Sequence, residues 1–141
     1  PRGTGGSAKL RIQERIDRSF ARPRITVTGY LHRHELIDLY LRSRVLAFPS
    51  LDEGFGIPAL EAMAYGLAVV SSDRSALPEV CGRAAILVNP LDVESIAHGL
   101  RRVTSDDALR VQYQTMGRSR APQYPWQRAV EETWAVYGEL L

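Results

Sequence analysis

The chain has 141 residues, enough for one domain of common size with a hydrophobic core. Its apolar fraction of 45% and its charged fraction of 24% match those of globular proteins and argue against wholesale disorder. The formal net charge is only +2, and the basic residues are spread along the chain, which argues against a nucleic-acid-binding surface.

The sequence carries no membrane or secretion signal. No apolar run approaches membrane-spanning length, and the first six residues lack the hydrophobic stretch of a signal peptide. The single cysteine, Cys81, excludes an intramolecular disulfide and a cysteine-based zinc site, and we predict a small residue packed at a helix end. The chain begins with Pro1 and not methionine, so we expect a fragment of a longer protein.

The first third of the chain shows two helical patterns, each followed by a strand pattern. Apolar residues spaced among charges indicate the helices, and β-branched or apolar runs indicate the strands. We expect Pro23 to end the first helix and Gly29 to close the first strand. The predicted elements are a helix over 8–19, a strand over 24–28, a helix that starts after about residue 34, and a buried strand over 45–48.

The middle of the chain begins with a glycine-containing loop over residues 51–57. Pro58 suits a first helical turn, good helix formers follow it, and Gly66 supplies a C-terminal stop. The predicted elements here are this helix over 59–65, a strand over 67–71, a short helix over 77–81 and a strand over 86–88.

The last third of the chain is predicted to be helical. Asp92 suits the N-cap of a helix over 93–103, and two further helices are expected over about 106–118 and 126–140. The alternation of strands and helices along the chain implies right-handed crossovers and an α/β fold, in which a parallel sheet carries helices on both faces.

Ligands of such sheets bind outside the carboxyl ends of the strands. The candidate site therefore comprises the loops after Thr28, Phe48 and Ser71. The same rule fits the loop near residues 4–7, if a strand precedes it.

The loop after Phe48 and the following helix combine two carboxylates with two glycines. Gly54 and Gly56 let the backbone approach a ligand and expose amide protons close to a helix start, where anionic and hydroxyl ligands are favoured. Glu53 precedes this turn and Glu61 lies one turn inside the helix. Each carboxylate can accept hydrogen bonds from two vicinal sugar hydroxyls. The segment thus suits a nucleotide sugar, which has a sugar at each end and phosphates between.

Two other interpretations of this segment are open. It can be an ordinary loop and helix start, with Glu61 in a surface salt bridge. A hydrolase acid and nucleophile pair is weaker, because glycosidase carboxylates flank one scissile bond and usually come from separate strand ends. Glu61, in contrast, lies back along a helix.

The same segment resembles the signature of the retaining glycosyltransferase family 4, whose members have the GT-B architecture of two Rossmann-like domains. The pattern Glu, seven residues, Glu carries the resemblance, which extends over most of the chain. It implies a single Rossmann-like donor-binding domain over 1–141, the C-terminal half of a retaining hexosyltransferase, with its first strands absent. The matching segments are 27–31, 35–40, 48–50, 62–71 and 77–80, together with Trp126 and Tyr137 in the last helices.

Carried over by position, the resemblance implies roles for individual residues. Glu53 would be the catalytic residue that faces the donor sugar hydroxyls, and Glu61 would hold the ribose hydroxyls. The backbone near Leu31 would contact the base, while Gly29 and Ser50 would shape the crevice. The implied donor-binding residues are Leu31, Glu53, Gly54, Phe55, Gly56, Ile57 and Glu61, with the amides of 55–57 along the sugar and phosphate.

The resemblance also implies that some functional groups lie outside the chain. The family's pyrophosphate-binding arginine and lysine precede the segment at residues 3–6, and the acceptor-binding domain precedes them. Arg24 and Arg33 do not match those positions and are expected to be solvated. We therefore expect the isolated chain to lack transferase activity.

The implied substrates are a nucleotide sugar and a carbohydrate or lipid-linked acceptor. GDP-mannose is favoured over a UDP-sugar, because residues 52–56 and 75–80 resemble those of bacterial polysaccharide mannosyltransferases. No metal or other cofactor is expected, since related GT-B enzymes act without one and the sequence shows no metal-ligand spacing. The parent is expected in the cytoplasm, as a peripheral protein at the inner face of the membrane. The alternative function is a non-catalytic nucleotide-sugar-binding or interaction module.

Overall fold

The computed structural model describes residues 5–140, which form two compact units divided between Arg33 and His34. The single domain expected over residues 1–141 stays a prediction.

The first unit contains helix α1 (Gly5–Asp17) and the short 3-10 helix η1 (Arg22–Arg24). The predicted helix is confirmed, but it ends at Asp17, and Pro23 lies in η1 instead of ending α1. The Arg22 guanidinium lies 3.1 Å from the Asp17 carboxylate and bridges the two elements.

The strand predicted over residues 24–28 was wrong. A strand exists only where its backbone N–H and C=O groups pair with a neighbour. In the described part of the chain, residues 25–28 pair with no strand, and they adopt an irregular conformation that ends in a left-handed Gly29 with φ of 68°.

The second unit is built on a parallel sheet with the order β1 (Val45–Phe48), β2 (Ala68–Ser72) and β3 (Ala85–Val88). In register, Leu46 pairs with Val69, which in turn pairs with Ala85. The central strand β2 is buried along its whole length. Strand β1, predicted to be buried, is only half-buried and exposes Ala47, because within the described residues it pairs on one side alone.

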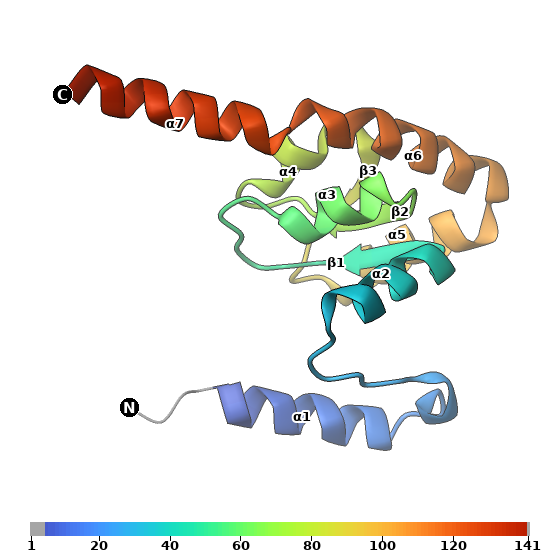
Figure 1. The fold of residues 1–141 in the computed structure, drawn as a ribbon. Helices are drawn as coiled ribbons and strands as arrows, with labels where there is room; N and C mark the ends of the chain where they lie inside the picture. The colour runs from blue at the N-terminus through green and yellow to red at the C-terminus, as the bar shows by residue number, and fades with distance from the viewer. Residues whose placement is uncertain (1–4, 141) are drawn as a thin grey trace. The chain divides into compact units, whose positions relative to one another are not determined.

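Helices cover both faces of this sheet, as predicted (Figure 1). On one face, Tyr40, Met63 and Cys81 pack against Val69 of β2. On the other, Val103 packs against Val70 and Ile86. The helices of the second unit are α2 (Arg33–Arg42, of which Arg33 belongs to the first unit), α3 (Ile57–Ala64), α4 (Leu77–Cys81), η2 (Gly82–Ala84), α5 (Val93–Ser105), α6 (Asp107–Arg120), η3 (Ala121–Gln123) and α7 (Trp126–Leu140).

The backbone of α5 approaches the sheet at Gly99. A Cβ atom built on Gly99 would lie 2.6 Å from Val88 Cγ1 and 3.2 Å from Val70 Cγ1, so an added methyl group does not fit there. Asp92, the predicted N-cap of α5, accepts a hydrogen bond from the Glu94 amide at 2.9 Å. This confirms the start of the helix.

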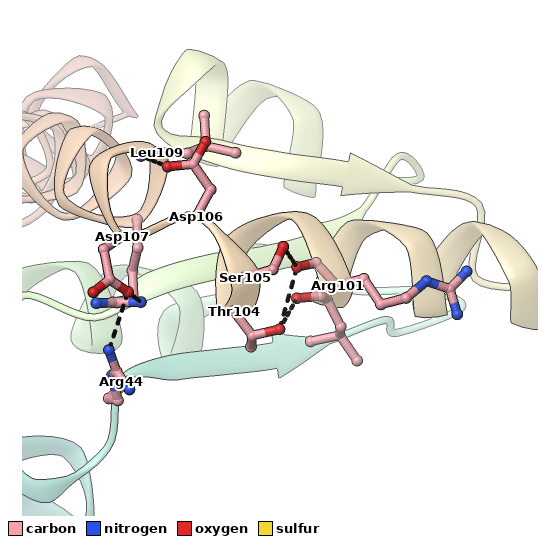
Figure 2. Close-up of polar contacts among 9 residues, drawn as sticks. Arg44, Arg101, Thr104, Ser105, Asp106, Asp107 and Leu109 are labelled. Atoms are coloured by element: carbon pink, nitrogen blue, oxygen red, sulfur yellow. Dashed lines mark hydrogen bonds and ion pairs between the residues drawn. The ribbon is translucent and has the colours of Figure 1, made fainter.

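A polar junction links α5, α6 and the start of β1 (Figure 2). Asp106 caps α6 by accepting a hydrogen bond from the Leu109 amide at 2.9 Å. Asp107 lies 2.6 Å from the Arg110 guanidinium and 3.3 Å from that of Arg44. The hydrogen bond and charge of Arg110, and then the charge of Arg44, lower the pKa of Asp107.

Cys81 is the last residue of α4 and is completely buried, as predicted. Burial raises the pKa of its thiol, and the Ser71 hydroxyl and the charge of Arg120 oppose this shift. Within residues 5–140, no helix combines the length and apolar character that crossing a bilayer requires.

Candidate functional site

The Glu53 loop, defined as residues 49–56, leaves the carboxyl end of β1 and leads into α3. The turn at its end depends on Gly56, which has φ of 96° and ψ of 42° as the N-cap of α3. That conformation is strained for residues with a Cβ, and a Cβ on Gly56 would also collide with Leu77 of α4. Gly56 therefore lets the loop lie directly on α4.

This turn presents unpaired backbone donors. In the described residues, the amide N–H groups of Phe55, Gly56 and Ile57 have no hydrogen-bond partner, whereas the next available amide, that of Ala59, donates to the Gly56 carbonyl at 3.0 Å. Phe55 and Ile57 are also exposed. The three amides and the N-terminal end of the helix dipole favour an oxygen ligand here.

Glu53 is half-buried and is oriented by a neighbouring hydroxyl. The Ser50 hydroxyl donates to Glu53 Oε1 at 2.9 Å. The second carboxylate oxygen, Oε2, has no partner among the described residues. One oxygen thus fixes the side chain while the other remains available to a ligand hydroxyl.

Glu61, in the first turns of α3, is also oriented by a hydroxyl group, which in this case comes from another helix. The hydroxyl of Tyr40 on α2 donates to Glu61 Oε2 at 3.4 Å, and Oε1 has no partner in the part of the chain that the structure describes. The Tyr40 ring stacks on that of Tyr65, with 5.5 Å between centroids. Burial, followed by the charge and hydrogen bond of Glu61, raises the pKa of Tyr40 to about 12, so this hydroxyl stays a donor at neutral pH.

The Glu53 loop is tied to the loop after β2. The Ser75 hydroxyl donates to the Asp52 carboxylate. Ser75 has φ of 52°, a left-handed conformation that is uncommon for a residue other than glycine. These loops lie at the edge where the parallel strands end, as the topology predicts for a ligand site.

The structure brings together only part of the predicted site. Glu53, Gly54, Phe55, Gly56, Ile57 and Glu61 lie on one loop and the helix that follows it. Leu31, Gly29, Arg24 and Arg33 belong to the first unit. A contact between Leu31 and the base of a ligand therefore stays a prediction, as do the binding roles of the other residues.

Two residues that contact the site were not predicted from the sequence to do so. Tyr40 had been placed only on a helix, although its hydroxyl contacts Glu61. Tyr124 had no role, yet its ring meets that of Phe55 edge to face, with 5.5 Å between centroids and 83° between planes. A weak sequence signal existed for Tyr40 alone, since an aromatic with a polar tip on the apolar face of a helix commonly finds a hydrogen-bond partner.

Chemically, the site offers two carboxylate acceptors, three amide donors and an aromatic ring. No group of three or more potential metal ligands occurs among residues 5–140. The arrangement fits a ligand that carries hydroxyl groups at two places and an oxygen-rich group between them.

One protein family and two individual proteins, among others, match the sequence of this chain. The family described as "Glycosyl transferases group 1" matches residues 3–120. The O-antigen chain mannosyltransferase B of Escherichia coli is 36% identical over 113 residues, covering 80% of this chain and 30% of that protein. The MMP alpha-(1->4)-mannosyltransferase of Mycolicibacterium hassiacum is 40% identical over 115 residues, covering 79% of this chain and 28% of that protein.

Among solved structures, the sucrose-phosphate synthase of Thermosynechococcus elongatus has the same fold as this chain. The TM-score is 0.85 at 27% identity, and the match covers 99% of this chain and 36% of that one. The chain thus spans about a third of the length of each of these three proteins.

Proposed function

Because the chain belongs to the group 1 glycosyl transferases, we propose that it is the donor-binding domain of an enzyme that transfers a sugar from a nucleotide sugar. One observation carries the proposal: Glu53 and Glu61, each held through one oxygen, flank three unpaired amides. A nucleotide sugar presents hexose hydroxyls, phosphate oxygens and ribose hydroxyls in that order, which matches the order of these groups.

In the proposed complex, each group of the site has a separate task. Glu53 accepts hydrogen bonds from the donor sugar hydroxyls through Oε2 and acts as the catalytic residue that orients the sugar. The amides of residues 55–57 donate to the sugar and phosphate oxygens. Glu61 accepts hydrogen bonds from the ribose hydroxyls through Oε1, and the backbone near Leu31 contacts the base.

The proposed reaction retains the configuration of the sugar. The acceptor hydroxyl oxygen forms a bond to the anomeric carbon on the face from which the phosphate departs, while the bond between that carbon and the phosphate oxygen breaks and the hydroxyl proton passes to the departing phosphate. Negative charge develops on the departing phosphate, and donors already fixed at that position stabilise the charge without reorganising. The free amides at the start of α3 are suited to this task, and the proposal includes no metal or other cofactor.

Mannose is the proposed sugar and GDP-mannose the proposed donor, with a UDP-sugar as the second choice. Support comes from the two relatives described above, both of which are named as mannosyltransferases. The proposed acceptor is a carbohydrate or a lipid-linked glycan in polysaccharide biosynthesis. The proposal places the longer enzyme in the cytoplasm, peripherally at the inner face of the membrane, with the acceptor bound outside this chain.

A non-catalytic nucleotide-sugar-binding module is the second candidate. It is favoured by one observation, which is that the Glu53 loop contains two carboxylates and no lysine or arginine. A loop without cations can bind hydroxyls but leaves the charge of a departing phosphate to the backbone amides alone. The two candidates agree on binding by the chain and differ on turnover by the longer protein.

The proposed role of Glu53 is tested by comparing the affinity for the sugar nucleotide with the affinity for the free nucleotide. We expect Glu53→Gln to weaken binding of GDP-mannose by about 1–3 kcal/mol, because a charged acceptor for the sugar hydroxyls is lost. Binding of GDP itself should be unchanged, since GDP lacks the hexose. Isothermal titration calorimetry on the 141-residue chain measures the affinities for GDP-mannose and GDP. The same comparison is made with UDP-glucose and UDP. Equal losses for sugar nucleotide and free nucleotide would refute this assignment.

A further inference from the structure

The centre of the Glu53 loop has little internal support. Nothing lies within 4 Å of a Cβ atom built on Gly54, so no neighbouring element packs over that side of the loop. On either side, Asp52 is tied to Ser75, and Gly56 packs against Leu77. Between these points, the Phe55 ring contacts that of Tyr124 and no other ring within residues 5–140. The Ser50 hydroxyl holds Asp52 and Glu53 at the start of this stretch, and at Phe55 the position of the free amides depends on the contact with Tyr124.

Tyr124, which follows η3, is itself held firmly. Its hydroxyl accepts a hydrogen bond from an Arg120 Nη2 at 2.7 Å and donates to the Glu79 carbonyl at 3.3 Å. The Arg120 guanidinium also lies over the Tyr124 ring, 5.1 Å from its centroid. The ring is thus fixed from its hydroxyl end and from one face.

Arg120 connects this ring to the body of the domain. It donates from Nη2 to the Glu79 carbonyl at 2.6 Å and from Nε to the Val80 carbonyl at 3.0 Å. These carbonyls belong to the last turn of α4, whose C-terminal groups lack helical partners and favour a cation. Arg120 is on α6, so the network joins α4, α6 and the Glu53 loop.

We propose that Tyr124 is a positioning residue that holds the Glu53 loop, through Phe55, in the conformation that presents its free amides to the donor phosphate. This inference rests on the proposed function for its consequence in binding. The physical reason is preorganisation: a loop already held in the bound conformation loses less conformational entropy when the ligand binds. Tyr124 acts through Phe55 and needs no contact with the ligand.

The test combines a ligand-independent measurement with a binding measurement on the 141-residue chain. In Tyr124→Leu we expect the backbone ¹⁵N order parameters of residues 54–57 to fall from about 0.85 to below about 0.6. Calorimetry with GDP and with UDP should show a roughly two- to tenfold rise in Kd. This is the fold-change expected when the interaction energy of one edge-to-face ring pair is lost. Phe55→Leu removes the same contact from the loop side and should give the same two changes.

Two variants separate this role from a general loss of stability. Tyr124→Phe keeps the contact with Phe55 and loses the two hydroxyl hydrogen bonds that fix the ring, so both changes should be clearly smaller than in Tyr124→Leu. Tyr113→Leu removes a half-buried tyrosine from the other face of α6, where it packs near Val103 and Ile96. It should lower the melting temperature while leaving the loop and the Kd unchanged.

Each result decides one of the two hypotheses. Wild-type order parameters in both Tyr124→Leu and Phe55→Leu would overturn the positioning role, and so would a mobile loop with an unchanged Kd. Absence of nucleotide binding by the wild type would overturn the proposed function and the consequence for binding. The order parameters would still show whether Tyr124 holds the loop.

Discussion

At the scale of single residues, each carboxylate of the site is held by one hydroxyl and keeps one free oxygen. Ser50 orients Glu53 and Tyr40 orients Glu61. The two hydroxyls differ in setting, because Tyr40 is buried whereas Ser50 lies near the surface of the loop. Burial makes the Tyr40 hydroxyl an unusually weak acid and links its protonation to the stability of the fold.

The pH dependence of stability tests this link. The pKa of Tyr40 is raised to about 12 in the folded chain, compared with about 10 in an unfolded one. A raised pKa favours the neutral hydroxyl, so its contribution is fully present below about pH 10 and is lost as pH rises towards 12. We expect the difference in melting temperature between wild type and Tyr40→Phe to shrink from pH 9 to pH 12.

Tyr65→Phe is the matched control for this prediction. Tyr65 stacks on Tyr40, but no hydrogen bond links its hydroxyl to Glu61. The charge of Tyr65 is the smallest cause of the raised pKa of Tyr40, so the difference between wild type and Tyr65→Phe should change much less across this range. A Tyr40→Phe difference that stays constant from pH 9 to pH 12 would contradict the assignment.

At the scale of elements, the close approach of α5 to the sheet determines which glycines can be replaced. Gly99 faces Val88 and Val70, whose branched side chains are buried and have little room to move. Gly138 on α7 faces open space, with nothing within 4 Å of an added Cβ. Both glycines lie within helices, but an added Cβ atom would meet core side chains at Gly99 and open space at Gly138.

Replacing these glycines by alanine should have opposite effects. Gly99→Ala overpacks the core, which costs about 1–3 kcal/mol, and the higher helix propensity of alanine offsets up to about 1 kcal/mol. We expect a net loss in the free energy of unfolding, measured by urea denaturation. Gly138→Ala should leave that free energy unchanged or raise it. A higher free energy of unfolding for Gly99→Ala than for the wild type would show that α5 does not approach the sheet so closely.

Local signals in the sequence predicted most elements of the fold. Pro58, Gly66 and Asp92 marked helix boundaries that the structure confirms, and the alternation of patterns predicted the parallel sheet. The strand over 24–28 was wrong because strand pairing depends on a neighbouring strand, which a local pattern does not reveal. The family and the α/β fold that the resemblance implied are confirmed by the comparisons.

The side-chain contacts of the site could not be predicted in the same way. The segment from Glu53 to Glu61 was found from its residue types, because it combines two carboxylates with two glycines at the start of a helix, and the family resemblance then favoured one of its possible interpretations. Tyr40 and Tyr124 come from other elements of the chain, and only folding places them beside Glu61 and Phe55. For Tyr40 the local sequence indicates at most that its hydroxyl finds a hydrogen-bond partner, and for Tyr124 it indicates nothing.

At the scale of the whole molecule, the second unit is a three-layer body from which α7 projects (Figure 1). Trp126 and Trp134 on this helix are 75% and 69% exposed. The Glu53 loop, in contrast, is held by contacts to α4 and to the residues between α6 and α7. The carboxylates and amides of the proposed donor site therefore all lie within this one unit, which allows binding to be tested on the chain itself.

Calorimetric titration of the 141-residue chain with GDP and UDP tests the proposed donor site most directly. The account predicts saturable binding of at least one nucleotide, with Glu61→Ala weakening it by about 1–3 kcal/mol because charge-assisted hydrogen bonds to the ribose are lost. Glu94→Ala, at an exposed carboxylate on α5 that is remote from the Glu53 loop in sequence, should bind as the wild type does. No saturable heat at millimolar nucleotide, or equal affinities for wild type and Glu61→Ala, would contradict the account.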